Sequence, residues 1–161
     1  MNLFMHYAFD CWMQRTLAKC PFARYADDAV VHCRTETEAA EVMQAIASRL
    51  AECGLTMHPD KSKIVYCKDS NRKQSHANVS FTFLGFTFRP RQAMSRQGRL
   101  FTSFLPGVSA DALKRMRATV KRWWLPQQTP GTLAELAQHC NPTARGWWNY
   151  YGAFYPTALQ T

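Results

Sequence analysis

The chain has 161 residues, of which 47% are hydrophobic and 13% aromatic, so it can bury one sizeable core or a modest core with a small appendage. This composition excludes a disordered or collagen-like chain. A formal net charge of +9 favours binding to polyanions, most commonly nucleic acids. Charged residues interrupt every apolar run before it reaches the roughly 20 residues of a membrane-spanning helix, and the first residues lack a secretory signal pattern.

The excess positive charge lies in one block, residues 89–124, where nine basic residues stand against Asp111 alone. A solvated face normally mixes both signs, so the block favours contact with a phosphate backbone over ordinary solubility. The six cysteines are widely scattered and the five histidines form no ligand pair. These spacings favour reduced thiols in a cytosolic protein and give little support to a zinc site.

Residues 3–13 predict a helix that is apolar on more than one face. It starts without a capping residue, as if the polypeptide entered in the middle of a fold. Residues 22–34 then place apolar β-formers on both sides of Asp27 and Asp28, which predicts a hairpin with the two acids at its tip.

Thr35 and Glu38 form a capping-box pattern, and apolar residues recur at helical spacing from there to Gly54. This is the most clearly predicted helix. Two short strands are expected after it, at Leu55–Met57 and Lys61–Tyr66, followed by a polar loop over residues 68–78.

Aromatic residues predict a strand over residues 81–88, whose alternation slips at Leu84 and Gly85. A glycine at this point indicates a bulge, or a place where another backbone or a ligand comes close. A further strand is expected at Arg99–Leu105, ended by Pro106 and Gly107.

The remaining residues predict helices, so the fold class is α+β up to residue 105 and all-α beyond it. Ser109 caps the first helix, which has Lys114, Arg117 and Lys121 along its outer face. Its inward residues are expected to be Leu113, Met116, Val120 and either Trp123 or Trp124. A short second helix is expected from Thr129 and Pro130 to Asn141 and Pro142, and a third over residues 145–151.

Adjacent aspartates at a hairpin tip suit one chemistry in particular. Two divalent cations held for phosphoryl or nucleotidyl transfer need several carboxylates that converge from rigid elements. Neighbouring strand residues point to opposite faces, so one of Asp27 and Asp28 aims into such a site and a further carboxylate must come from elsewhere. The pair alone is more often a solvated turn.

The order of several motifs favours a catalytic role for the acidic pair over a solvated turn. They are Arg24–Val31, the capped helix, Gly54–Ile64, Phe81–Phe86 and Arg145–Tyr151. In this order and spacing they resemble the C-terminal part of a bacterial group II intron reverse transcriptase, or maturase, and residues 2–10 resemble the helix before its active-site hairpin. The resemblance implies a partial polymerase palm, an antiparallel sheet with a packed helix, over residues 1–105. A helical thumb and maturase region follows over residues 106–161.

The resemblance also assigns roles to single residues. Asp27 would be a catalytic carboxylate that binds Mg²⁺, with Asp28 as its neighbour in the same motif, and Tyr25 would lie beneath the nucleotide. Lys61 falls near the position linked to protonation of the pyrophosphate leaving group, although it is equally well explained as a surface lysine, and Lys63 is close enough to blur the assignment. Phe83, Leu84, Gly85 and Phe86 would form the primer-gripping hairpin, with Gly85 leaving room for the primer strand.

Two functions remain open. The family's first catalytic aspartate lies on an earlier strand, so the 161 residues alone are expected to bind Mg²⁺ weakly or not at all and not to polymerise. They would be a truncated copy, or one part of a split enzyme that needs an N-terminal reverse transcriptase half or a dimer mate. The alternative is a non-enzymatic maturase remnant that binds intron RNA, or an inactive product.

The expected partners are group II intron RNA and a primer/template, in the bacterial cytoplasm, with no membrane. The four tryptophans after residue 122 are candidates for stacking on bases, although a core position is the commoner role for such residues. Phosphate contacts are expected from Lys114, Arg115, Arg117, Lys121, Arg122 and Arg145.

Overall fold

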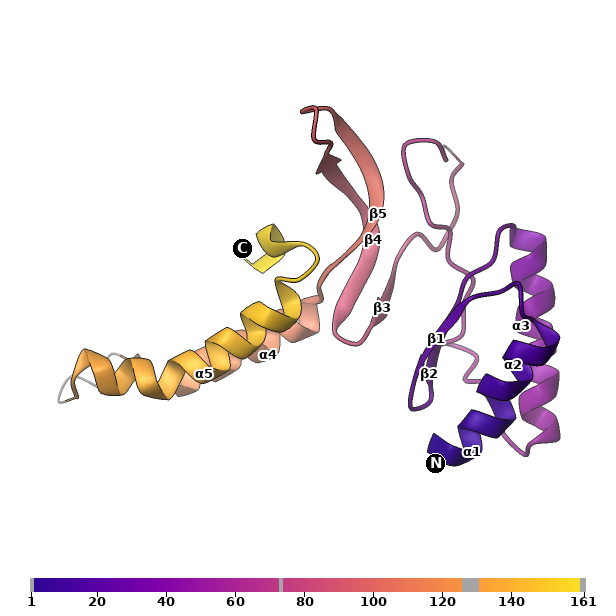
Figure 1. Cartoon of the computed structure of the whole chain (residues 1–161), viewed down its shortest axis with the longest axis horizontal. Coiled ribbons are helices and arrows are strands. Elements are labelled where there is room, and N and C mark those ends of the chain that lie inside the picture. The colour runs from indigo at the N-terminus through magenta and orange to yellow at the C-terminus, as the bar shows by residue number, and fades with distance from the viewer. Residues whose placement is uncertain (1, 73, 126–130, 160–161) are drawn as a thin grey trace. The chain divides into compact units, whose positions relative to one another are not determined.

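A computed structural model describes residues 2–72, 74–125 and 131–159 of the chain (Figure 1). Its internal contacts divide the chain into two compact units, residues 1–65 and residues 66–161. Each unit combines helices with an antiparallel sheet, which confirms the predicted α+β class. In the described ranges, no helix has both the length and the apolar character needed to cross a membrane.

The N-terminal unit begins with a continuous helical run that contains one wider turn. Its segments are α1 (Asn2–Met5), the π-helical η1 (His6–Asp10) and α2 (Cys11–Thr16). Met5, Phe9 and Met13 recur every four residues along this run and are at most 8% exposed, so they form the centre of the unit's core. The helix predicted over residues 3–13 is confirmed.

A hairpin follows, formed by β1 (Phe22–Tyr25) and β2 (Asp28–Val31). Phe22 pairs with Val31 and Tyr25 with Asp28, so that only two residues form the loop. The predicted hairpin with the acidic pair at its tip is confirmed. Phe22 and Val31 share one face and pack against the core, whereas Tyr25 and Asp28 share the opposite face.

Helix α3 (Glu36–Glu52) starts and ends where the sequence predicts, and it lies beside the initial helical run (Figure 1). The Thr35 hydroxyl accepts a hydrogen bond from the Glu38 amide at 3.1 Å, and Gly54 adopts a φ of +73° beyond the last turn. The Glu38 carboxylate departs from the usual capping box, because it accepts from the Arg34 amide at 2.6 Å.

The segment after α3 contains no strand, so the strands predicted at Leu55–Met57 and Lys61–Tyr66 are wrong. A strand is stabilised by a ladder of backbone hydrogen bonds to a neighbour. Here the Tyr66 amide donates one isolated bond to the Asn78 carbonyl, at 2.8 Å, and the described residues provide no ladder alongside. The polar loop predicted over residues 68–78 is confirmed where the structure describes it.

The C-terminal unit contains a three-stranded antiparallel sheet with β4 at its centre. Its strands are β3 (Phe81–Phe83), β4 (Phe86–Met94) and β5 (Leu100–Val108). The bulge considered at Gly85 is wrong, because Leu84 and Gly85 form the two-residue loop of a hairpin between β3 and β4. Both residues have positive φ, 51° and 79°, as a type I′ turn requires, so the slip in aromatic alternation marks a change of strand.

The sequence also predicts that Pro106 and Gly107 end the last strand, but β5 runs through both of them to Val108. Proline cannot donate to a ladder and is therefore confined largely to edge strands. Since β5 is the edge of this sheet, Pro106 can pair opposite Phe88 without breaking the sheet.

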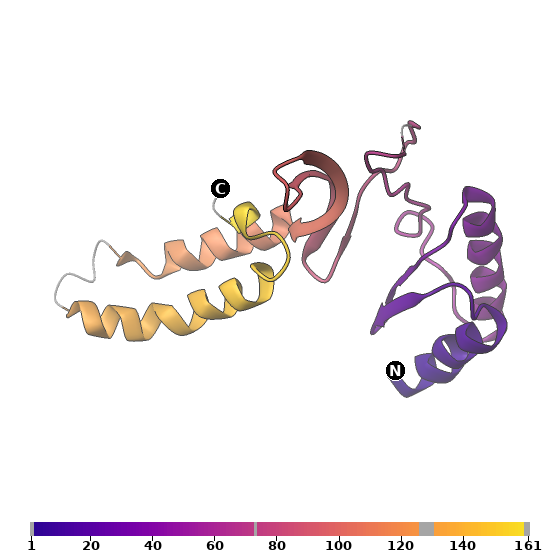
Figure 2. The same ribbon diagram turned by 45° about the horizontal axis from the view of Figure 1, so that its top comes forward.

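Two antiparallel helices complete the unit and lie side by side (Figure 2). Their bounds are α4 (Ala110–Arg122) and α5 (Leu133–Tyr151), and the 3₁₀-helix η3 (Pro156–Leu159) follows. The Ser109 hydroxyl caps α4, as predicted, by accepting from the Ala112 amide at 3.2 Å. Thr132 and Glu135 form a capping box at the start of α5. The start predicted at Thr129 and Pro130 lies outside the described residues.

The two short helices predicted on either side of Asn141 and Pro142 are in fact one, because α5 passes through both residues. An interior proline removes one backbone hydrogen bond and costs about 3 kcal/mol. Packing beyond the proline compensates, since the Trp147 ring stacks on Trp123 at 5.7 Å and Tyr151 joins the core of the unit.

That core is formed by Val108, Ala112 and Met116, against which Leu113 also packs. Val120 was expected to point inward, but it is 41% exposed. It lies near the end of α4, whereas the buried residues of the helix occupy its first two turns. Of the two tryptophans considered for an inward position, the structure selects Trp123.

The chain passes from the first compact unit to the second after Val65. The domain boundary predicted from the resemblance, between residues 105 and 106, stays a prediction.

The two units differ strongly in net charge. The N-terminal unit has seven Lys and Arg against eight Asp and Glu, a net charge of −1. The C-terminal unit has thirteen against three, a net charge of +10.

Candidate active site and nucleic-acid interface

The acidic pair occupies the tip of the β1–β2 hairpin. Asp27 is the second loop residue and Asp28 is the first residue of β2, and both are exposed. Tyr25 lies directly opposite Asp28 on the same face, and its side chain is 64% exposed. The structure therefore brings three of the predicted site residues together on a surface that is open to a ligand.

An arginine clamp, formed by Arg24 and Asp10, holds this hairpin tip. The Arg24 guanidinium donates from Nε and Nη2 to the two carboxylate oxygens of Asp10, each at 2.6 Å, and from Nη1 to the Ala26 carbonyl at 2.6 Å. Ala26 has a φ of +54°, a conformation that is costly for a residue with a Cβ. The clamp thus ties the strained loop residue before Asp27 to the initial helical run.

The same contact holds the pKa of the Asp10 carboxyl below its usual value, chiefly through the hydrogen bonds from Arg24. Sequence reasoning missed both residues of the clamp. The alternation of side chains along the strand could have revealed Arg24. It places Arg24 on the inward face of β1 with Phe22, opposite to the face of Tyr25. A charged side chain on an inward face requires a partner.

The carboxylates present do not by themselves fit a two-ion Mg²⁺ centre. Such a centre needs acidic ligands that converge from separate elements, whereas Asp27 and Asp28 are neighbours on one turn. Across the described residues, no group of three or more His, Cys, Asp or Glu side chains is placed to hold a metal ion.

Lys61 lies in the turn after α3, and its side chain is exposed, as is that of Lys63. Within the described residues, no hydrogen bond or ion pair connects Lys61 to Asp27 or Asp28. The role of Lys61 in leaving-group protonation stays a prediction.

The four residues predicted to grip the primer form the hairpin between β3 and β4, with Leu84 and Gly85 in its turn. Leu84 is 39% exposed, whereas Phe86 is 6% exposed and belongs to the core of the C-terminal unit. The Phe83 and Phe86 backbones pair at the base of the turn. Of these four residues, Leu84 alone is exposed, so contact with a ligand would be made at the turn through Leu84.

The predicted phosphate-binding cations lie on the surface of the helical pair. Lys114, Arg117 and Lys121 follow one another at spacings of three and four along α4, and Arg115 and Arg122 form a second row. Arg145 lies on α5. All six side chains are exposed, and we call them the cationic face.

The tryptophans divide between the two roles considered for them. Trp123 and Trp147 stack on each other and are partly buried, which accounts for both by packing. Trp124 and Trp148 are 56% and 54% exposed and remain candidates for stacking on bases.

Arg91 belongs to the basic block but is held within the fold. Its guanidinium lies 5.1 Å from the centre of the Tyr155 ring, a cation–π contact, and burial lowers the pKa of the group. A Cβ added at Gly107 would lie 2.5 Å from its Nη2 atom. We therefore exclude Arg91 from the cationic face.

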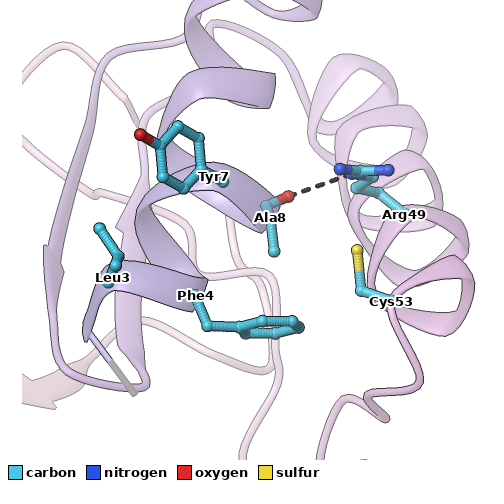
Figure 3. Close-up of a pocket in the computed structure, with 6 residues that line it drawn as sticks. All are labelled: Leu3, Phe4, Tyr7, Ala8, Arg49 and Cys53. Atoms are coloured by element: carbon cyan, nitrogen blue, oxygen red, sulfur yellow. Dashed lines mark hydrogen bonds between the residues drawn. The ribbon is translucent and has the colours of Figure 1, made fainter.

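A separate apolar hollow of about 420 Å³ opens beside α1 (Figure 3). It is lined by Leu3, Phe4, Tyr7, Ala8, Arg49 and Cys53. The Arg49 guanidinium contributes to structure here, because its Nε donates to the Ala8 carbonyl at 3.1 Å. With one positive side chain and no carboxylate in its lining, the hollow lacks the groups that nucleotidyl transfer requires.

Two known families match parts of the chain. Residues 1–88 match the family described as reverse transcriptase (RNA-dependent DNA polymerase), a range that includes the Asp27–Asp28 hairpin and the β3–β4 turn. Residues 113–160 match the group II intron maturase-specific domain, which covers most of α4 and all of α5. Neither a curated protein nor a solved structure matched the chain. The chain therefore belongs to the group II intron reverse transcriptase and maturase family.

Proposed function

We propose that this chain binds group II intron RNA through the cationic face of its C-terminal unit, as a maturase does. The observation that carries the proposal is the exposed double row of basic side chains on α4, which has Asp111 as its only acidic residue. Phosphates neutralised by such a surface release counterions, which gives affinity without sequence preference. The exposed rings of Trp124 and Trp148 add a means of holding unpaired bases.

Binding of a labelled RNA at several salt concentrations tests this proposal. Lys114→Glu combined with Lys121→Glu is expected to weaken binding at least tenfold and to reduce the slope of log affinity against log salt by about 1.4, since each lost single-strand phosphate contact removes about 0.7. The matched control is Arg96→Glu with Arg99→Glu, which changes the net charge equally at the exposed turn between β4 and β5. An equal loss in both variants would show that net charge alone drives binding, and would refute the proposal.

The second candidate function is nucleotidyl transfer, favoured by the exposed acidic tip and by the clamp that fixes it. We propose that the 161 residues supply one part of a polymerase site, in which Asp27 and Asp28 serve as the acidic pair, Tyr25 supports the nucleotide and Lys61 acts on the leaving group. A further carboxylate would come from a separate reverse transcriptase half or from a dimer mate.

Primer extension with Mg²⁺ distinguishes this role from RNA binding alone. The chain by itself is expected to incorporate no nucleotides, whereas addition of an N-terminal reverse transcriptase half should restore incorporation that Asp27→Asn abolishes. Incorporation by the chain alone would refute the need for a further carboxylate. Failure of the mixture at a concentration where the two parts associate would favour the maturase role alone.

A further inference from the structure

Two tyrosines of the maturase-specific domain close on the turn between β3 and β4. We propose that Tyr150 and Tyr151 are positioning residues that fix the Leu84–Gly85 turn for contact with the primer strand. This inference rests on the proposed nucleotidyl-transfer function, in which the Leu84–Gly85 turn is predicted to contact the primer. It assigns to the end of α5 a structural link between the maturase-specific domain and the reverse transcriptase region, both of which contribute residues to the C-terminal unit.

Both carbonyl groups of the turn are held from outside the hairpin. The Tyr150 hydroxyl donates to the Leu84 carbonyl at 2.9 Å, and the Ser109 amide donates to the Gly85 carbonyl at 2.9 Å. The carbonyls of a two-residue loop commonly face water. Here α5 binds one of them, and the residue that caps α4 binds the other.

The second tyrosine, Tyr151, limits the size of the side chain that position 85 can hold. A Cβ built on Gly85 would lie 2.8 Å from the Tyr151 hydroxyl oxygen and 3.4 Å from its Cε1 atom. The space beside Gly85, which the sequence suggested for the primer strand, is therefore taken up by the protein itself. Gly85 is required both by its positive φ and by the approach of Tyr151.

An aromatic cluster anchors the tyrosines next to the turn. The Phe86 ring centre lies 5.1 Å from that of Tyr150, 5.2 Å from that of Tyr151 and 5.5 Å from that of Phe154. Ring pairs at these distances contribute stabilisation in addition to that from the apolar area they bury. Any shift of the end of α5 would move the two hydroxyl groups and, with them, the Leu84–Gly85 turn.

The experiment compares Tyr150→Phe with Tyr155→Phe. Each variant removes one hydroxyl that donates to a distant carbonyl in the same unit, that of Leu84 or that of Gln92 at 3.2 Å. Amide hydrogen exchange is followed in the peptide over residues 81–88, and binding of a DNA primer annealed to an RNA template is measured beside binding of single-stranded RNA.

Tyr150→Phe should speed exchange at the turn about fivefold, as expected for one lost hydrogen bond, and should weaken primer–template binding while RNA binding stays the same. Tyr155→Phe should do neither. Unchanged exchange in Tyr150→Phe would overturn the positioning role. Faster exchange with unchanged primer–template affinity would overturn the link to the primer. If the unmodified chain binds no primer–template at all, the proposed polymerase function fails instead, and the exchange result still decides the positioning role.

A double-mutant cycle provides a second test. Gly85→Ala should speed exchange at the turn strongly, and Tyr151→Phe should relieve part of that effect, because it removes the hydroxyl that lies nearest to the added Cβ. The relief remains partial, since the positive φ of Gly85 still opposes alanine. Additive effects of the two substitutions on the exchange rate would show that Tyr151 does not restrict the side chain at position 85, and would overturn this part of the inference.

Discussion

Replacement of Arg24 by lysine should loosen the β1–β2 hairpin more than the conservative nature of this substitution suggests. Lysine keeps the charge, but its ammonium group cannot hold both Asp10 oxygens and the Ala26 carbonyl in one plane. Hydrogen bonds to charged groups contribute roughly 1.5–3 kcal/mol each, and the Arg24 and Asp10 side chains are only 11% and 17% exposed. Since lysine retains part of the attraction, we expect a loss of about 2–3 kcal/mol in the stability of the N-terminal unit.

Urea titration followed through amide NMR signals of β1 and β2 measures this loss. Arg49→Lys is the matched control, because Arg49 makes a comparable bond to the Ala8 carbonyl and a more exposed ion pair with Glu52, and it should cost less than about 1 kcal/mol. If Arg24→Lys costs no more than the control, the clamp contributes little to the hairpin, and the argument for it fails.

The pH dependence provides an independent check on the clamp. Because the pKa of Asp10 is lowered in the folded chain, the stabilisation is complete above the ordinary value of 3.8 and is lost as the pH falls through the lowered value. Asp10→Asn should therefore be less stable than the unmodified chain at pH 6, and the difference should shrink toward pH 2. A difference that does not change with pH would contradict this account.

Three further predictions concern other elements. Pro142→Ala should raise the thermal stability of the C-terminal unit by about 1–3 kcal/mol, measured by the fluorescence of its four tryptophans, because it restores a backbone donor inside α5. Ser109→Ala should lower stability in the same assay by about 1 kcal/mol, since the Ala112 amide loses its cap. Burial raises the pKa of Cys33 to about 11, so its alkylation at pH 8 should be slower than that of a free cysteine, and its contribution to stability should fall as the pH rises from about 9 to 11.

Local sequence signals were sufficient wherever one short pattern decides the structure. Thr35 with Gly54, Ser109, and the acidic pair between β-formers each specify a cap or a turn through contacts within a few residues. These elements appear where they were predicted, and they place the exposed acids and the cationic face. The corresponding functional roles stay predictions.

The errors arise where distant contacts override local preference. Pro142 would end an isolated helix, but packing of Trp147 and Tyr151 carries α5 past it. Pro106 would end an isolated strand, yet pairing with β4 carries β5 past it. Conversely, residues 61–66 have the composition of a strand but find no ladder among the described residues. The Arg24 clamp was missed for a related reason, because its partner lies 14 residues earlier in the chain.

The unequal charges of the two units have a kinetic consequence. A polyanion diffusing toward the chain is attracted by the unit of net charge +10 and gains nothing from the unit of net charge −1 that carries the acidic hairpin. First encounters with nucleic acid should therefore occur on the C-terminal unit, at association rates that fall as ionic strength rises. Contact of a bound strand with Asp27 and Asp28 would then follow as a later and slower step than the initial association.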